Sequence, residues 1–122
     1  MTVDTAQAEE FQVALVRGEI DIATAPLLRE QLDGFKPGPL VVSLEDVAYC
    51  DSTGLSALIA QRRARDGRIV VVVRPNGPVR RLFAVAGLED TFALVESLAE
   101  APGRMRSALA GTEGSAETSV SK

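Results

Sequence analysis

With 122 residues, the chain is long enough for one domain with a core of ordinary size, and its hydrophobic content of 46% is typical of a globular fold. The net charge of −4 provides no electrostatic attraction for a phosphate backbone, so we expect no nucleic-acid partner. The sequence contains no histidine, which excludes catalysis through an imidazole and nearly all zinc sites. We therefore expect no enzymatic activity, no metal and no cofactor.

The sequence also argues against a membrane protein and against a disulfide. No apolar run approaches the length of about eighteen residues that a membrane span needs, and residues 1–5 lack the features of a signal peptide. These features predict a cytoplasmic protein with no membrane partner. Cys50 is the only cysteine, and its place after an apolar run predicts a small buried side chain. The basic clusters at 62–65 and 80–81 are expected to be solvated helix faces.

The first half of the chain changes from a strand period to a helix period. Alternating apolar residues over Phe11–Arg17 predict a half-buried strand, which a lead-in over residues 1–10 precedes. Apolar residues at helical spacing then predict a first helix from about Thr24 to Asp33. The runs Leu40–Leu44 and Ile69–Val73 are short and nearly free of polar residues, which indicates strands covered on both faces. These two runs are expected to form the centre of the sheet.

Two further helices and a last short strand are expected around and after the second apolar run. The second helix is predicted from about Thr53 to Asp66, where a glycine follows it. A third helix is predicted over Pro78–Ala86, because proline suits the first helical position and a glycine follows the last turn. Phe92–Val95 is predicted to be a short strand. The alternation of strands and helices predicts an α/β fold with a mainly parallel or mixed sheet of four or five strands.

The C-terminal part carries weaker signals. Ser97–Glu100 has the spacing of a capping box for a final helix, but Pro102 and Gly103 disfavour its continuation. From Gly111 onward the sequence has no pattern that could form a core. We therefore expect residues 101–122 to be a poorly ordered extension that is disordered from about residue 111.

The most informative motif is Asp51-Ser52-Thr53-Gly54-Leu55, which follows the run Leu40–Leu44 after a short gap and opens the second helix. This order places Ser52 where the N–H groups of the first turn and the positive end of the helix dipole favour an anion, including a phosphate added by modification. The alternative is an ordinary helix cap, because Ser, Thr and Asp are all preferred there. Position alone leaves both interpretations open.

Several segments, in this order and spacing, resemble a known family. They are Gly18-Glu19-Ile20-Asp21, Ala25-Pro26-Leu27-Leu28-Arg29, Leu44-Glu45-Asp46-Val47 before the Asp51–Leu55 motif, and Val79-Arg80-Arg81-Leu82-Phe83 with Ala86-Gly87-Leu88. Together they are similar to the STAS domain of bacterial anti-sigma factor antagonists, over roughly Phe11–Glu100. The resemblance implies a single STAS-like domain over residues 11–100, with about four helices packed mainly on one side of the sheet.

The resemblance also implies a switch. In that family the serine directly after the aspartate, here Ser52, is phosphorylated by a partner anti-sigma factor that is itself a serine kinase. Unphosphorylated protein would bind the anti-sigma factor and free the sigma factor, and a phosphatase acting on phospho-Ser52 would restore that state. Thr53 is the rival acceptor. Ser56 stands where the family motif usually has a second glycine.

The implied partner-binding residues lie at the start of the second helix and at the end of the first strand. They are Asp21, Asp51, Ser52, Thr53, Gly54 and Leu55. Other STAS proteins belong to lipid-transport complexes and stress-signalling assemblies, so a scaffold or accessory subunit of such an assembly is the alternative function. An enzyme built on the carboxylates and hydroxyl of this set would lack a base for the serine.

Overall fold

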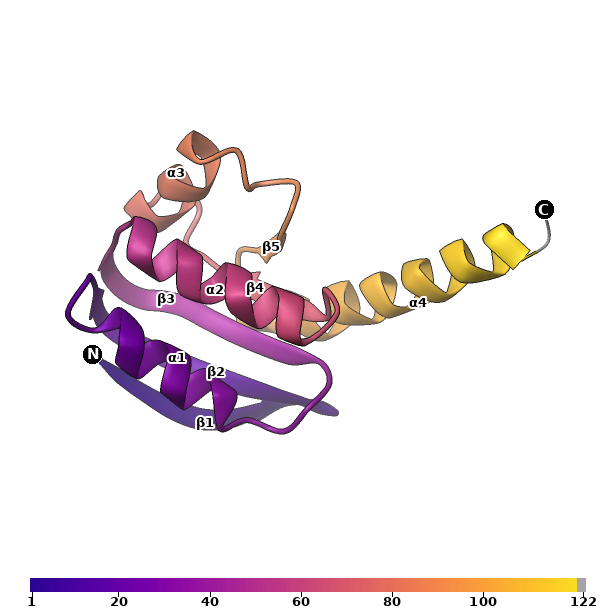
Figure 1. The fold of residues 1–122 in the computed structure, drawn as a ribbon, viewed down its shortest axis with the longest axis horizontal. Coiled ribbons are helices and arrows are strands. Elements are labelled where there is room, and N and C mark those ends of the chain that lie inside the picture. The colour runs from indigo at the N-terminus through magenta and orange to yellow at the C-terminus, as the bar shows by residue number, and fades with distance from the viewer. Residues whose placement is uncertain (121–122) are drawn as a thin grey trace.

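A five-stranded sheet forms the centre of the structure, a computed structural model that describes residues 1–120, with side chains up to residue 110 (Figure 1). The strands lie in the order β1-β2-β3-β4-β5. Strand β1 runs antiparallel to β2, and the remaining neighbours are parallel. The mixed α/β sheet predicted from the sequence is therefore confirmed.

Strands and helices alternate along most of the chain. The strands are β1 Thr2–Ala8, β2 Phe11–Ile20, β3 Leu40–Cys50, β4 Ile69–Val72 and β5 Ala93–Val95. The helices are α1 Ala25–Asp33, α2 Ser52–Ala64, α3 Pro78–Val85 and α4 Ala101–Val120, and a 3-10 turn over Leu98–Glu100 precedes the last. Among these described residues, no helix has the length and apolar content needed to cross a membrane.

Apolar side chains fill both faces of the sheet. On one face the strands pack against Leu28 of α1, Leu58 of α2 and Phe83 of α3. On the other face they pack against Ala101 and Met105 of α4. Three helices thus cover one face and the start of one helix covers the other, while the rest of α4 extends away from the sheet (Figure 1). This agrees with the expectation of helices mainly on one side.

The helix on the second face explains why β2 is buried more fully than expected. The alternation over Phe11–Arg17 predicted a half-buried strand. In the structure Phe11 and Val13 face α4, whereas Ala14 and Val16 face the other helices, and all four are buried. The prediction was wrong because the cover on the second face comes from a segment more than eighty residues away, counted from Val13 to Ala101.

Both ends of the chain are more structured than the sequence suggested. Residues Thr2–Ala8 form β1 and pair with β2 from Thr2↔Arg17 to Ala8↔Phe11, in place of the expected lead-in. Residues 101–110 begin α4, in place of a poorly ordered extension, because buried apolar side chains hold this part of the helix on the sheet. Disorder was expected from residue 111, and the side chains of these residues lie outside the described part of the structure. The backbone there continues α4 to Val120, and residues 121 and 122 lie outside the described residues.

Arg65 lies inside the protein, whereas the basic cluster at 62–65 was expected to be a solvated face. Its side chain is 5% exposed. Its Nε donates to Gln61 Oε1 at 3.0 Å, and its terminal nitrogens donate at 2.7–3.1 Å to the backbone carbonyls of Leu32, Lys36 and Gly38. Arg65 therefore ties the end of α2 to the last turn of α1 and to the segment that connects α1 with β3.

Candidate functional site

The candidate site lies where the parallel strands β2 and β3 end side by side. Their last residues, Ile20 and Cys50, are register partners, and the backbone N–H of Asp51 donates to the carbonyl of Ile20 at 3.2 Å. A turn to α1 follows β2 directly, and α2 follows β3 directly. The structure thus brings Asp21 and Asp51 together at the C-terminal ends of the parallel strands. Open parallel sheets place their binding sites at this end.

Asp51 is the N-cap of α2. Its backbone is extended, and its Oδ1 accepts hydrogen bonds from the backbone N–H of Thr53 at 2.9 Å and from the Thr53 hydroxyl. The hydrogen bond from the Thr53 side chain is the largest cause that lowers the pKa of Asp51 below its usual value, and backbone N–H donors add to it. Asp51 is therefore ionised at neutral pH.

Ser52 is the first residue of α2, and its side chain is exposed. Within the described part of the chain, no group forms a hydrogen bond with the Ser52 hydroxyl, whereas its carbonyl accepts from the Ser56 hydroxyl at 3.1 Å. Thr53, the rival acceptor, is half-buried, and its hydroxyl is engaged with Asp51. Asp51, and not Ser52, is therefore the cap of α2, and the Ser52 hydroxyl is not used for capping.

Gly54 and Leu55, which were expected at the partner-facing turn, lie beneath it. Leu55 is 5% exposed and belongs to the core. A Cβ on Gly54 would stand 2.5 Å from Cys50 Sγ and 2.8 Å from Ile20 Cγ2, closer than side chains approach one another. The first turn of α2 therefore packs directly on the ends of β2 and β3, and this packing fixes the position of the Ser52 backbone. Cys50 is buried as expected, and burial raises the pKa of its thiol to about 11.

Asp21 begins the turn that joins β2 to α1. Its Oδ1 accepts from the backbone N–H groups of Ala23 at 3.0 Å and Thr24 at 3.1 Å. Its backbone N–H donates to the Thr24 hydroxyl oxygen at 2.9 Å. The carboxylate is therefore engaged in holding this turn, which we call the Asp21–Thr24 turn.

Sequence reasoning missed Ile22, which lies in the Asp21–Thr24 turn with 77% of its surface exposed. An isoleucine between a strand and a helix carries no periodic signal, because it belongs to neither apolar face. The only available signal was a large apolar side chain at a position where turns usually place polar or small residues.

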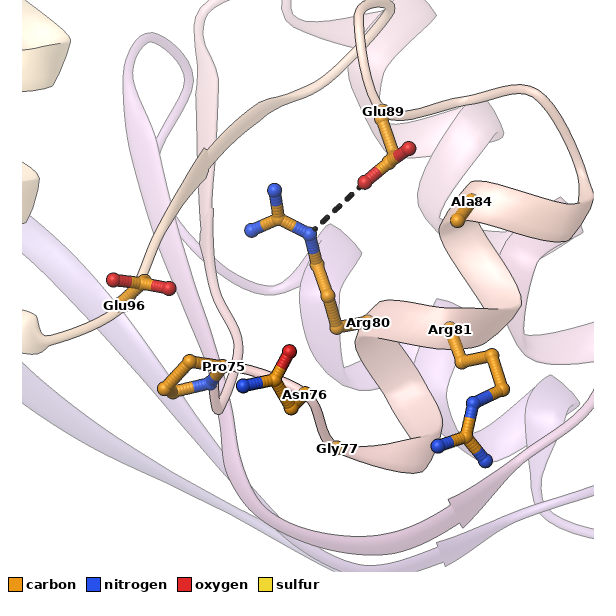
Figure 2. A pocket seen from close by; sticks show the side chains of 8 residues that line it. All are labelled: Pro75, Asn76, Gly77, Arg80, Arg81, Ala84, Glu89 and Glu96. Carbon is orange, nitrogen blue, oxygen red and sulfur yellow. Dashed lines mark hydrogen bonds and ion pairs between the residues drawn. The ribbon is translucent and has the colours of Figure 1, made fainter.

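A separate hollow of about 360 Å³ lies at the start of α3 (Figure 2). Its other wall includes Glu89 and Glu96, which lie before and after β5. Arg80 Nε donates to Glu89 Oε2 at 3.2 Å, and Figure 2 shows the guanidinium with Glu89 on one side and Glu96 on the other. Arg81 also lines the hollow, and its guanidinium points away from that of Arg80 (Figure 2). The acids balance the charge of Arg80, so we assign no anionic ligand to this hollow. Residues 1–110, whose side chains the structure describes, contain no cluster of side chains suited to a metal ion.

Comparison with known proteins defines the class. The sequence model of the Mlab, STAS domain family matches residues 2–96. The anti-sigma-B factor antagonist of Staphylococcus aureus (strain NCTC 8325 / PS 47) is 31% identical over 97 residues, covering 74% of this chain and 88% of the relative. That of Bacillus subtilis (strain 168) is 33% identical over 94 residues, covering 74% and 86%.

A solved structure agrees in both sequence and fold. The crystal structure of an anti-sigma factor antagonist from Mycobacterium paratuberculosis is 31% identical and matches with a TM-score of 0.76 over 86% of this chain and 93% of that chain. The domain is thus of the STAS class. The chain belongs to the STAS-domain family of anti-sigma factor antagonists.

Proposed function

We propose that this protein is an anti-sigma factor antagonist whose unphosphorylated form binds an anti-sigma factor serine kinase and thereby releases the sigma factor. Phosphorylation of Ser52 by that kinase ends the binding, and a phosphatase that removes the phosphate restores it. The observation that carries this proposal is the exposed Ser52 hydroxyl at the N-terminus of α2, with which no described group forms a hydrogen bond. The proposed function also places the protein in the cytoplasm, where sigma factors act.

The local charges account for the direction of the switch. A phosphate adds roughly −1.5 to −2 charges at Ser52. This charge lies beside the ionised Asp51 and at the same end of the parallel strands as Asp21. The N-terminus of α2 accommodates an anion, so the fold is expected to survive the modification. A partner surface that fits a neutral hydroxyl would meet concentrated negative charge instead. Repulsion and loss of contact at an intact surface then separate the two proteins.

The first experiment maps the acceptor. The protein is incubated with the anti-sigma factor kinase and ATP, and the modified residue is identified by mass spectrometry. Ser52→Ala should abolish phosphorylation and keep the fold and the binding of the partner. Ser56→Ala is the matched control, because Ser56 is an exposed serine one turn later on the same helix. Phosphate on Thr53 in the parent protein, with Ser52 unmodified, would contradict the assignment.

The second experiment tests the switch by calorimetry with the same partner. Ser52→Asp should keep the far-UV circular dichroism of the parent and weaken binding by at least about 2 kcal/mol, roughly thirty-fold in Kd. Ser52→Asn is the neutral control of similar size and should bind more tightly than Ser52→Asp. If the aspartate variant bound as tightly as the parent, Ser52 would lie outside the interface. The alternative of a scaffold or transport subunit would then gain support.

A further inference from the structure

Ile22 is a large exposed apolar side chain at the same end of the sheet as the proposed phosphorylation site. It follows Ile20 by two residues, and the Ile20 carbonyl accepts the hydrogen bond from the N–H of Asp51. Its exposed fraction of 77% is unusual for an isoleucine, although single exposed apolar residues are common on protein surfaces. Exposure alone therefore does not mark a contact residue.

The Asp21–Thr24 turn distinguishes Ile22 from an ordinary exposed side chain. Hydrogen bonds to Asp21 Oδ1 close the turn around it, and the Thr24 hydroxyl donates to the Glu19 carbonyl at 3.0 Å. The backbone N–H of Ala25 also donates to the Asp21 carbonyl at 2.8 Å. The backbone on both sides of Ile22 is thus fixed before any partner arrives, which reduces the entropy lost on binding.

Other exposed apolar side chains lie at the same end of the sheet. Tyr49, 49% exposed, is the penultimate residue of β3, and Leu27, 42% exposed, lies in the first turn of α1. Ile22 lies in the turn between β2 and that helix. The remaining large hydrophobic residue with high exposure in the described part of the chain is Val85, at the far end of α3. Exposed apolar side chains are therefore concentrated around the end of the sheet that carries Ser52.

We propose that Ile22 is the apolar anchor of the partner surface and inserts into a hydrophobic pocket of the anti-sigma factor kinase. Asp21 is a positioning residue that holds the turn instead of contacting the partner. This inference rests on the proposed function and adds to it a residue that determines which kinase is bound. An anchor held rigidly at the same end of the sheet as Ser52 would also fix where the kinase meets the hydroxyl that it phosphorylates.

Two substitutions of Asp21 distinguish a positioning role in the turn from a direct contact of its negative charge with the partner. The turn uses Asp21 Oδ1 only as a hydrogen-bond acceptor. The amide oxygen of Asp21→Asn can accept the same hydrogen bonds, whereas Asp21→Ala cannot. A positioning role therefore predicts that the asparagine variant binds nearly as well as the parent and that the alanine variant binds less well. A contact through the negative charge predicts that both variants lose affinity.

The test measures binding of the full chain to the purified anti-sigma factor serine kinase on a biosensor. Ile22→Ala should raise Kd by about tenfold or more, as truncation of a central contact residue does, and Ile22→Asp should raise it further. Val85→Ala is the matched control, because Val85 is 81% exposed and ends α3, an element separate from the β2–α1 turn. Circular dichroism and the urea midpoint of each variant establish that the fold is kept.

The outcomes separate this inference from the proposed function. Weak binding by Ile22→Ala, normal binding by Val85→Ala and recovery in Asp21→Asn relative to Asp21→Ala support the inference. If Ser52→Asp weakens binding but Ile22→Ala binds like the parent, the inference is overturned and the proposed function stands. If the parent binds no anti-sigma factor kinase from its own organism, the proposed function fails and the inference fails with it.

Discussion

Asp51 and Ser52 are neighbours in sequence, but the fold gives their side chains different environments. The Asp51 carboxylate turns back to the backbone of α2 and accepts from Thr53, while the Ser52 hydroxyl is exposed. If Ser52 itself were the cap, its hydroxyl would be occupied by the helix, and a phosphate there would displace the cap. With Asp51 as the cap, the start of α2 can keep its structure whether Ser52 is modified or not.

The lowered pKa of Asp51 predicts how stability depends on pH. The unfolded chain has the ordinary aspartate pKa, so the hydrogen-bonded carboxylate stabilises the fold above that value. This contribution is lost as the pH falls through the lowered pKa of the folded state. Between about pH 5 and pH 2.5 the urea midpoint of Asp51→Asn, which cannot titrate, should therefore fall less than that of the parent. Equal falls in the two proteins would show that Asp51 does not contribute.

At the scale of elements, the packing of α2 on the ends of β2 and β3 sets the geometry of the site. Gly54 permits this close approach, because its missing side chain leaves room for Cys50 Sγ and Ile20 Cγ2. At the other end of α2, Arg65 holds the helix to the last turn of α1 and to the segment between α1 and β3. The helix that presents Ser52 is thus fixed at both of its ends.

Gly54→Ala is expected to lower the free energy of unfolding by about 1–3 kcal/mol, because the added methyl group must displace its buried neighbours. Gly103→Ala is the matched control, since Gly103 lies in α4 and a Cβ there meets nothing within 4 Å. Urea denaturation gives both values. Adding Cys50→Ala to this variant removes the close contact with the sulfur atom and should recover part of the lost stability. The recovery should be incomplete, because the close contact with Ile20 remains. A Gly54→Ala variant as stable as the parent would show that the strand ends move aside freely.

The sequence was sufficient for elements whose apolar residues repeat along the chain. The apolar runs of β3 and β4, and helices α1, α2 and α3, lie close to their predicted positions, and the Asp51–Leu55 motif opens α2 as predicted. Strand β3 continues to Cys50, six residues beyond the predicted end at Leu44, so no loop separates it from the motif. Strand β1 was missed because its mostly polar residues are held by pairing with β2. The burial of Arg65 depends on carbonyls about thirty residues earlier in the chain, and the exposure of Ile22 depends on a turn. Such tertiary effects leave no local pattern.

At the scale of the whole molecule, the sheet needs cover on two faces, and the second cover comes from the first turns of α4. Ala101 and Met105 lie against the valines of the central strands. Outside this contact, Arg106 forms ion pairs with Glu9 and Glu10 in the β1–β2 turn. Exposed pairs of this kind add little stability on their own, so the buried apolar contact is the main attachment of the helix.

Met105→Ala should therefore destabilise the protein by about 2–5 kcal/mol, the range for deleting a fully buried methionine side chain. Arg104→Ala, at the exposed neighbouring position, is the control and should change stability by less than about 0.5 kcal/mol. Urea denaturation and amide hydrogen exchange report the effect, and protection should decrease in β2 and β4. A Met105→Ala variant with the stability of the parent would mean that α4 is not part of the core.

The direction in which α4 leaves the sheet has a practical consequence. The helix extends toward the side of the molecule opposite the start of α2, so the last turn of α4 and the first turn of α2 lie far apart (Figure 1). A fluorophore or a fused protein attached beyond α4 would leave the Ser52 end open to a kinase. Labels on this end could follow complex formation in real time, and immobilisation through it would orient every molecule with Ser52 toward the solution.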